Sequence, residues 1–262
     1  MFDTRKKLKN KLRERKRTFA AWTSIGDAQI TEAFAQMDVD FIGIDIEHGT
    51  ISFEQCQRII AASQAYGTCC LPRIDSHSMP MIKRLLDSGA DGVIVPMVQT
   101  VEEVEKLIEW TKYPPKGKRS FGINRAQRYG WDFDTYTQQW NETSSLVLQI
   151  ESIAGVENIE RIMAFDEVDA VMVGPYDLSG SLGIPGQIDH PRVQEAAAHV
   201  ISTAKAKGRG CGTQIVEPTP EAIETAFSRG YTFNVLSSDI FLLWKWGENI
   251  KQMIRNARPK DL

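Results

Sequence analysis

The chain has 262 residues, of which 42% are hydrophobic, a formal net charge of -3 and a pI near 5.9. This length suits one large α/β domain or two small ones, and the low net charge provides no broad field for nucleic acid or an anionic membrane. No apolar stretch approaches the roughly 20 residues that span a bilayer, and the four cysteines lack C-x-x-C spacing. We therefore expect a cytoplasmic protein with free thiols.

The chain begins with a basic segment, "RKKLKNKLRERKR". Leu8 and Leu12 lie four residues apart, which is helical spacing, so we expect a solvated helix with one apolar edge. The segment has no interleaved aromatic side chain that could stack on bases, which argues against nucleic acid as a partner. We treat residues 1–17 as a helical arm and residues 18–262 as a single domain.

Short β-rich runs alternate with amphipathic helical segments from Thr18 onward. There are eight such runs: "TFAAWTS", "FIGIDIE", "CCLPRID", "GVIVPMV", "SLVLQIES", "AVMVGP", "RGCGTQI" and "TFNVLSS". Strands that are buried on both faces read as continuous apolar runs, so the pattern predicts an α/β fold, a single (β/α)₈ TIM barrel. A doubly wound open sheet is the competing fold, but no Gly-rich dinucleotide turn follows the first run.

One connection, residues 113–143, is too long and too polar for an ordinary turn. Long structured loops in compact domains tend to be functional. We expect its basic side chains either to meet an anionic substrate or another subunit, or to remain solvated: Lys116, Lys118, Arg119, Arg125 and Arg128.

Polar side chains follow six of the eight predicted strands. Because active sites of TIM barrels lie at the carboxyl ends of the strands, we expect these side chains to gather in one site. They are Asp45, Glu47 and His48 after the second strand, Arg73 after the third, Gln149 and Glu151 after the fifth, Gly174 to Asp177 after the sixth, Gln214 after the seventh and Asp239 after the eighth.

Glu151 and Asp177 follow neighbouring strands, and two close carboxylates stay ionised together only with a cation between them. Oxygen ligands favour Mg²⁺ or Mn²⁺, whereas the four histidines have no zinc-like spacing. In the alternative interpretation, each carboxylate caps a short helix. None of the predicted strands carries a lysine, so a Schiff base is not expected, and a carbonyl substrate would need a metal as Lewis acid.

His48 is a candidate general base because an imidazole near carboxylates can transfer protons near neutral pH. Arg73 is suited to a carboxylate or a developing oxyanion; the alternative is a structural salt bridge with Asp45 or Asp75. Asp87 ends a predicted helix, where a negative charge is disfavoured. We expect either His48 or an arginine of a neighbouring loop to compensate it.

Six stretches together resemble the HpcH/HpaI aldolase family, the metal-dependent class II pyruvate aldolases. They are "GIDIEHG", "LPRI", "IKRLLDSGADGVIVPMVQT", "YPPKGKRSFGINRAQRYG", "LVLQIES" and "VGPYDLSGSLGIPGQ", and the likeness runs in order from about Phe19 to Leu243. Each stretch alone is a weak signal, whereas six in sequence are specific. The likeness is to aldolases of the 4-hydroxy-2-oxoheptanedioate and 2-dehydro-3-deoxy-sugar-acid type.

The resemblance implies a TIM barrel that reversibly cleaves a 4-hydroxy-2-oxo acid to pyruvate and an aldehyde, with a divalent metal (Mg²⁺, Mn²⁺ or Co²⁺) stabilising the enolate. It places the metal on Glu151 and Asp177 and the base on His48, supported by Asp45 and Asp87. It implies that Arg73 stabilises the keto oxygen of the substrate and the enolate formed from it. It assigns other substrate contacts to Gln149, Gly174, Pro175, Tyr176 and Asp177.

The C-terminal segment "FLLWKWGENIKQMI" adds Trp244 and Trp246 to an apolar helix. This helix either packs on the barrel or contacts another subunit, and the resemblance implies a homo-oligomer, a hexamer that exchanges its C-terminal helices. Two other functions stay open at this point. One is an acyl-CoA lyase of the citryl- or malyl-CoA type, and the other is a non-catalytic binding protein.

Overall fold

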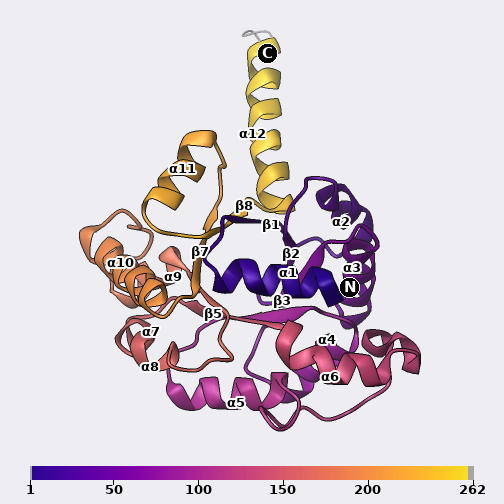
Figure 1. The fold of residues 1–262 in the computed structure, drawn as a ribbon. Helices are drawn as coiled ribbons and strands as arrows, with labels where there is room; N and C mark the ends of the chain where they lie inside the picture. Colours follow the sequence, from indigo (N-terminus) through magenta and orange to yellow (C-terminus); the bar gives the residue numbers. More distant parts are fainter. Residues whose placement is uncertain (1, 259–262) are drawn as a thin grey trace.

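The computed structural model describes residues 2–258. Eight parallel strands form a closed barrel with helices around its outside (Figure 1), which confirms the predicted (β/α)₈ architecture. The first strand pairs with both the second and the eighth, and this pairing closes the barrel. The strands are β1 (Thr18–Thr23), β2 (Phe41–Asp45), β3 (Cys69–Arg73), β4 (Gly92–Val95), β5 (Ser145–Ile150), β6 (Ala170–Val173), β7 (Gly210–Ile215) and β8 (Phe233–Leu236).

Many of the helices begin directly after a Ser, Thr or Asp whose side chain caps the helix N-terminus. Ser52 and Thr100, for example, each form a capping box with the residue three positions later. The helices are α1 (Phe2–Arg13), α2 (Ala28–Ala35), α3 (Phe53–Ala65), α4 (Met79–Asp87), α5 (Val101–Thr111), the 3₁₀ helix η1 (Arg125–Gly130), α6 (Phe133–Thr143), α7 (Ile153–Glu157), α8 (Ile159–Ile162), α9 (Pro175–Ser181), α10 (Pro191–Ala206), α11 (Pro220–Ser228) and α12 (Asp239–Ala257).

The barrel interior is filled by large side chains that face inward from the strands. Trp22, Phe41 and Phe233 belong to this buried cluster, and Leu8 and Leu12 of α1 join it from below. Helix α1 therefore lies across the amino-terminal end of the barrel and closes it (Figure 1). This closure leaves the opposite end, where the strands finish, as the open face.

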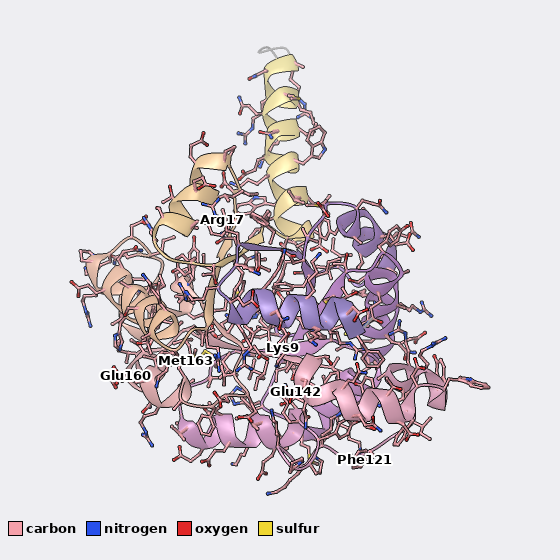
Figure 2. The ribbon with its side chains drawn as sticks, in the orientation of Figure 1. Lys9, Arg17, Phe121, Glu142, Glu160 and Met163 are labelled. Atoms are coloured by element: carbon pink, nitrogen blue, oxygen red, sulfur yellow. The ribbon has the colours of Figure 1, made fainter. Side chains whose placement is uncertain are left out.

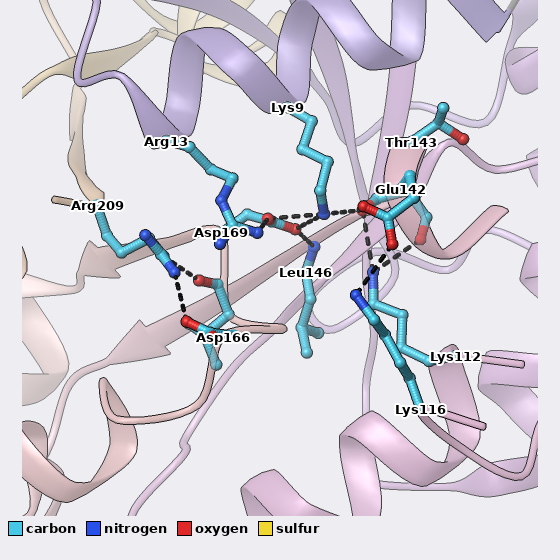
Figure 3. Close-up of polar contacts among 12 residues, drawn as sticks. Lys9, Arg13, Lys112, Lys116, Glu142, Thr143, Leu146, Asp166, Asp169 and Arg209 are labelled. Atoms are coloured by element: carbon cyan, nitrogen blue, oxygen red, sulfur yellow. Dashed lines mark hydrogen bonds and ion pairs between the residues drawn. The ribbon is translucent and has the colours of Figure 1, made fainter. Parts of the chain in front are cut away.

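The expectation that α1 is solvated is wrong for its inner face. Arg5 and Lys9 are only 4% and 5% exposed. The Arg5 guanidinium lies 2.7 Å from Asp91, and the Lys9 ammonium lies 2.7 Å from Asp169 (Figure 3). These carboxylates precede β4 and β6, so two buried anions at the base of the barrel hold two cations of the arm. These pairs could not be predicted from the sequence, because the partners are 86 and 160 residues apart.

Lys112 lies beside this cluster, at the end of α5. Its ammonium is buried and donates to the carbonyl and hydroxyl oxygens of Ser144, at 3.0 and 2.8 Å. Burial, together with the nearby charge of Lys9, lowers the pKa of Lys112 to about 7. The base of the barrel is therefore a charged but fully packed region.

The basic side chains of residues 113–143 all find partners within the chain. Lys116 pairs with Glu142, Lys118 with Glu109, Arg119 with Asp87, Arg125 with Gln64 and Arg128 with Asp132. The segment is ordered by η1 and α6, whose Tyr136 and Trp140 are buried. The expected meeting with an anionic substrate is not found, because no basic residue of this segment lines the cavity described below.

Helix α12 stands away from the barrel (Figure 1), and side chains extend into solvent along its outer part (Figure 2). Its apolar residues are exposed, including Leu243 at 58% and Trp246 at 62%. The alternative in which this helix packs against the barrel is therefore wrong. Only its first residue is buried: the Asp239 carboxylate accepts hydrogen bonds from Thr23 Oγ1 and Ser24 N, at 2.8 and 2.9 Å.

None of the helices described between residues 2 and 258 has the length and apolar character that a membrane-spanning segment needs.

Candidate active site

A cavity of about 510 Å³ opens at the carboxyl ends of the strands. It is lined by side chains from the ends of β1, β2, β3, β5, β6, β7 and β8. The expected site residues that line it are Asp45, His48, Arg73, Gln149, Gly174, Pro175, Tyr176, Asp177 and Gln214. The common level of strand ends in a parallel barrel thus brings together residues from distant parts of the chain.

Glu151 follows β5 and is buried, with 2% of its surface exposed. Its Oε1 accepts a hydrogen bond from the Met97 amide at 2.7 Å, and its Oε2 accepts one from Gln149 Nε2. Burial, together with the negative charges of Glu47 and Asp177, raises the pKa of Glu151 to about 7, against the hydrogen bonds that it accepts from Met97 and Gln149. A β-carbon on Gly174 would lie 2.5 Å from Glu151 Oε2, so only glycine fits beside this carboxylate.

Asp177 is the third residue of α9, which begins at Pro175 with Gly174 as its N-cap. The alternative in which Asp177 or Glu151 caps a helix is wrong, because Ser152 is the N-cap of α7. Asp177 is exposed to the cavity, and its negative charge raises the pKa of the buried Glu151 carboxylate. The pair is therefore electrostatically unfavourable without a cation.

The oxygen atoms of this region fit a hard cation. Gln149 Oε1 is buried without a hydrogen-bond partner, and Nε2 of the same amide donates to Glu151 Oε2. Residues 2–258 contain no group of three or more His, Cys, Asp or Glu side chains arranged as a metal site. A cation here would complete its coordination with water or substrate oxygens, as Mg²⁺ and Mn²⁺ do.

Among residues 2–258, Arg73 is the only arginine that lines the cavity. In-register pairing of β2 with β3 places it beside Asp45, and the two side chains approach to 2.8 Å. A second carboxylate, Glu47, lies 3.1 Å from Arg73 Nε, and the guanidinium stacks over the Trp22 ring at 5.1 Å. The salt bridge with Asp45 that was considered from the sequence is therefore present, and Arg73 also faces the cavity.

The His48 side chain is 66% exposed and lines the cavity. Its Nε2 lies 3.8 Å from Glu47 Oε2, whereas Asp45 Oδ1 accepts the His48 backbone amide at 3.2 Å. Asp45 thus holds the main chain at this turn, and Glu47 is the carboxylate nearest to the ring. Desolvation raises the pKa of Glu47, against the opposing charges of Arg73 and His48.

Asp87 lies outside the cavity lining. Arg119 compensates its charge at 2.8 Å, so of the two partners considered, the loop arginine is the one found. Arg119 is itself buried among the rings of Tyr113 and Trp140, at 4.7 and 4.5 Å from their centroids. Within the described part of the chain no hydrogen bond or ion pair links Asp87 to His48.

Sequence reasoning missed several parts of the site. The Met97 amide donates a hydrogen bond to Glu151 from a left-handed backbone conformation (φ 53°), and no sequence pattern predicts this conformation. Ile188, between α9 and α10, lines the cavity from a loop without periodicity. Glu47 was part of the polar strand end, but its place between Arg73 and His48 follows only from the fold.

A closed (β/α)₈ barrel with a buried carboxylate, a cavity-facing arginine and an exposed histidine at its strand ends has the architecture of a TIM-barrel enzyme. The model of the HpcH/HpaI aldolase/citrate lyase family matches residues 19–245. The chain therefore belongs to the HpcH/HpaI aldolase/citrate lyase family, and the resemblance noted from its sequence is confirmed.

Characterised relatives and solved structures agree with this assignment. A 2-dehydro-3,6-dideoxy-6-sulfogluconate aldolase of Pseudomonas putida is 34% identical, covering 88% of this chain and 90% of that protein. A hydroxypyruvate/pyruvate aldolase of Roseobacter denitrificans is 31% identical, covering 92% and 94%. The crystal structure of an HpcH/HpaI aldolase from Desulfitobacterium hafniense superimposes with a TM-score of 0.88 at 29% identity, covering 97% and 98%. The expected enzyme class, an aldolase and hence a carbon–carbon lyase, is confirmed.

Proposed function

We propose that this aldolase is divalent-metal-dependent and reversibly cleaves a 4-hydroxy-2-oxo acid to pyruvate and an aldehyde. The observation that carries the proposal is the buried Glu151, whose pKa is raised to about 7 by burial and by neighbouring carboxylates. Such a group is a poor structural element but a good cation ligand. The named activity of the Roseobacter relative, a hydroxypyruvate/pyruvate aldolase, supports pyruvate as one product.

Glu151 and Asp177 would hold the cation, with Mg²⁺, Mn²⁺ or Co²⁺ as candidates. The cation would supply Lewis acidity to the keto and carboxylate oxygens of the substrate. In the part of the chain that the structure describes, no barrel strand carries a lysine that could form a Schiff base instead. Gln149 would contact the substrate or a water through its free Oε1.

The exposed His48 ring is the group we assign to proton transfer at the 4-hydroxyl, directly or through a water. General-base help of this kind contributes about 10²- to 10⁴-fold in rate. Glu47, 3.8 Å from the ring, would orient the imidazole. Arg73 would donate to the oxygen that becomes negative as the carbon–carbon bond breaks.

The substrate carboxylate is assigned to the start of α9. Not every residue there can contribute an amide: the Gly174 amide already donates to the Ile150 carbonyl at 3.2 Å, and Pro175 has no N–H. Tyr176 and Asp177 remain as donors. Of residues 174–177, only these two therefore have a backbone amide that is available to the substrate carboxylate.

Pyruvate release from a 4-hydroxy-2-oxo acid tests the proposal. We expect turnover to fall below detection in excess chelator, to return with Mn²⁺, and to be lost in Glu151→Gln and Asp177→Asn. Glu160→Gln, an exposed carboxylate on α8 (Figure 2), is the matched control and should retain full activity. Undiminished pyruvate release in excess chelator would refute the metal-dependent mechanism. Cleavage of citryl- or malyl-CoA in place of the oxo acid would favour the acyl-CoA lyase function.

We also propose a homo-oligomer, with a hexamer as the specific expectation, in which α12 packs on a neighbouring subunit. The exposed apolar side chains of α12 support this, because a monomer would leave them in water. The base of the same helix contributes Ile240 and Phe241 to the cavity. Assembly would therefore enclose one side of the site.

A further inference from the structure

Charge is unevenly distributed around the cavity. Its charged lining residues and its histidine come from the ends of β2, β3 and β6, namely Asp45, His48, Arg73 and Asp177. The ends of β7, β8 and β1, with the loop before α10, contribute only uncharged side chains. We call this side the neutral arc: Ser24, Ile188, Gln214, Val216, Ser238 and Ile240.

The charged groups nearest to the neutral arc do not offer a cation to a ligand. Asp239 is buried, and its carboxylate accepts hydrogen bonds from Thr23 Oγ1 and from the amides of Ser24 and Ile25. Lys245 pairs with Glu217 at 2.8 Å and with Glu248 at 3.2 Å, outside the cavity lining. An anionic group on this side would meet no positively charged side chain among the described residues that line the cavity there.

Arg73 does not fill this role. It lies on β3, where its guanidinium contacts both Asp45 and Glu47 and stacks over the Trp22 ring of β1. Its charge is already balanced by these two carboxylates, whereas Glu151 and Asp177 are assigned to the proposed cation. A second anion would therefore be desolvated without a partner, which is unfavourable.

Space and polarity indicate what the neutral arc can hold. A cavity of about 510 Å³ is larger than pyruvate requires, so the remaining volume belongs to the second substrate. Ile188, Val216 and Ile240 provide apolar contact. Ser24, Ser238 and Gln214 provide hydrogen bonds of the kind that hydroxyl groups accept and donate.

We propose that the aldehyde partner is uncharged, with a short carbon chain that packs on the neutral arc, and that anionic aldehydes are disfavoured. This inference rests on the proposed aldolase function and specifies its second substrate. In the condensation direction, C3 of pyruvate loses a proton and bonds to the aldehyde carbon, whose oxygen gains a proton and becomes the 4-hydroxyl. The neutral arc contacts only the carbon chain beyond that carbon.

The test compares acceptors of equal length and different charge with pyruvate and Mn²⁺, using the full-length enzyme. Glycolaldehyde is compared with glyoxylate, and 4-hydroxybutanal with succinic semialdehyde, by kcat/KM for adduct formation. We expect the neutral member of each pair to be preferred by at least about tenfold, the effect of one unpartnered charge or missing polar contact. Equal or better use of the anionic members would overturn the inference.

Variants of the neutral arc test the cause of the preference. Val216→Lys should shift the ratio toward succinic semialdehyde by about tenfold or more, whereas Val216→Met, of similar length and no charge, should not. Ile240→Lys provides a second position, on the exposed base of α12, if Val216→Lys does not fold. If neither lysine variant changes the ratio relative to Val216→Met, the neutral arc does not set the preference.

A separate readout distinguishes failure of this inference from failure of the proposed function. Exchange of the pyruvate methyl protons for deuterium by the wild-type enzyme needs enolate formation but no aldehyde. Exchange together with a preference for anionic aldehydes would overturn only the present inference. Neither exchange nor condensation with any aldehyde would overturn the proposed function and the inference with it.

Discussion

In the cation-free protein the ionised Glu151 carboxylate lowers the free energy of unfolding, and a single substitution should show this. Its pKa in the folded state is about 7, above the ordinary value of 4.5, so the folded state holds the proton more tightly than the unfolded state. Stability is therefore lost as the pH rises from about 4.5 to 7, and the full penalty is present above pH 7. A shift of this size corresponds to roughly 3 kcal/mol.

We expect Glu151→Gln to be more stable than the wild type at pH 8 in chelator, although it is inactive. The new amide nitrogen would take the place of Glu151 Oε2, which accepts from Gln149 Nε2, so the Gln149 amide must turn over to present its Oε1 as the acceptor; the new oxygen keeps the hydrogen bond from the Met97 amide. The gain in the free energy of unfolding, measured by urea titration, should shrink as the pH is lowered toward 4.5. Glu160→Gln should show no such pH dependence, and a Glu151→Gln protein less stable at pH 8 would contradict the raised pKa.

Most candidate site residues could be predicted because strand ends in a parallel barrel share one level. This rule places Asp45, Arg73 and Gln149 together without knowledge of any loop. It does not choose partners: Asp87 could have met His48 or an arginine, and the choice of Arg119 depends on an aromatic pocket formed by residues far along the chain. Loop contributions such as Ile188 have no periodic signal at all.

Helix α1 shows how a basic segment can be structural. Asp169 receives the Lys9 ammonium, the Arg13 guanidinium at 3.1 Å and the Leu146 amide at 2.9 Å (Figure 3). Removing this carboxylate would leave the buried Lys9 without its counter-charge. Breaking a buried pair from one side costs about 3 to 5 kcal/mol.

We therefore expect Asp169→Asn to reduce the free energy of unfolding by that amount, measured by urea titration at pH 7. Glu224→Gln is the matched control, because the Arg17–Glu224 pair also fastens the N-terminal segment but is exposed on both sides. That variant should behave like the wild type. Equal effects of the two substitutions would mean that the contacts of α1 with the barrel base do not depend on the buried pair.

The order of strands and helices could be predicted from the alternation of apolar and amphipathic segments. The surfaces on which the terminal helices α1 and α12 pack could not. Apolar runs separated by capped amphipathic segments fix a parallel barrel because few other folds bury eight strands on both faces. The positions of α1 and α12 depend on which surface each helix finds, and that surface is built by residues distant in sequence. One terminal helix accordingly closes the barrel base, while the other leaves the opposite face.

The outward course of α12 leads to a prediction for the whole molecule. Leu243 and Trp246 lie three residues apart, on one face of the helix, and are exposed in the single chain. Replacing both with Ser should not unfold the chain, since neither packs on the barrel, but it should remove the main apolar contact between copies.

We expect sedimentation velocity to give a homo-oligomer for the wild type and a smaller species for the Leu243→Ser, Trp246→Ser double variant. Trp131→Ser is the matched control, because this indole is 85% exposed but follows η1, away from α12. Dissociation should also lower kcat/KM for the aldehyde, since Ile240 and Phe241 at the base of α12 line the cavity. A monomeric wild type, or a double variant that stays assembled, would show that α12 does not join the subunits.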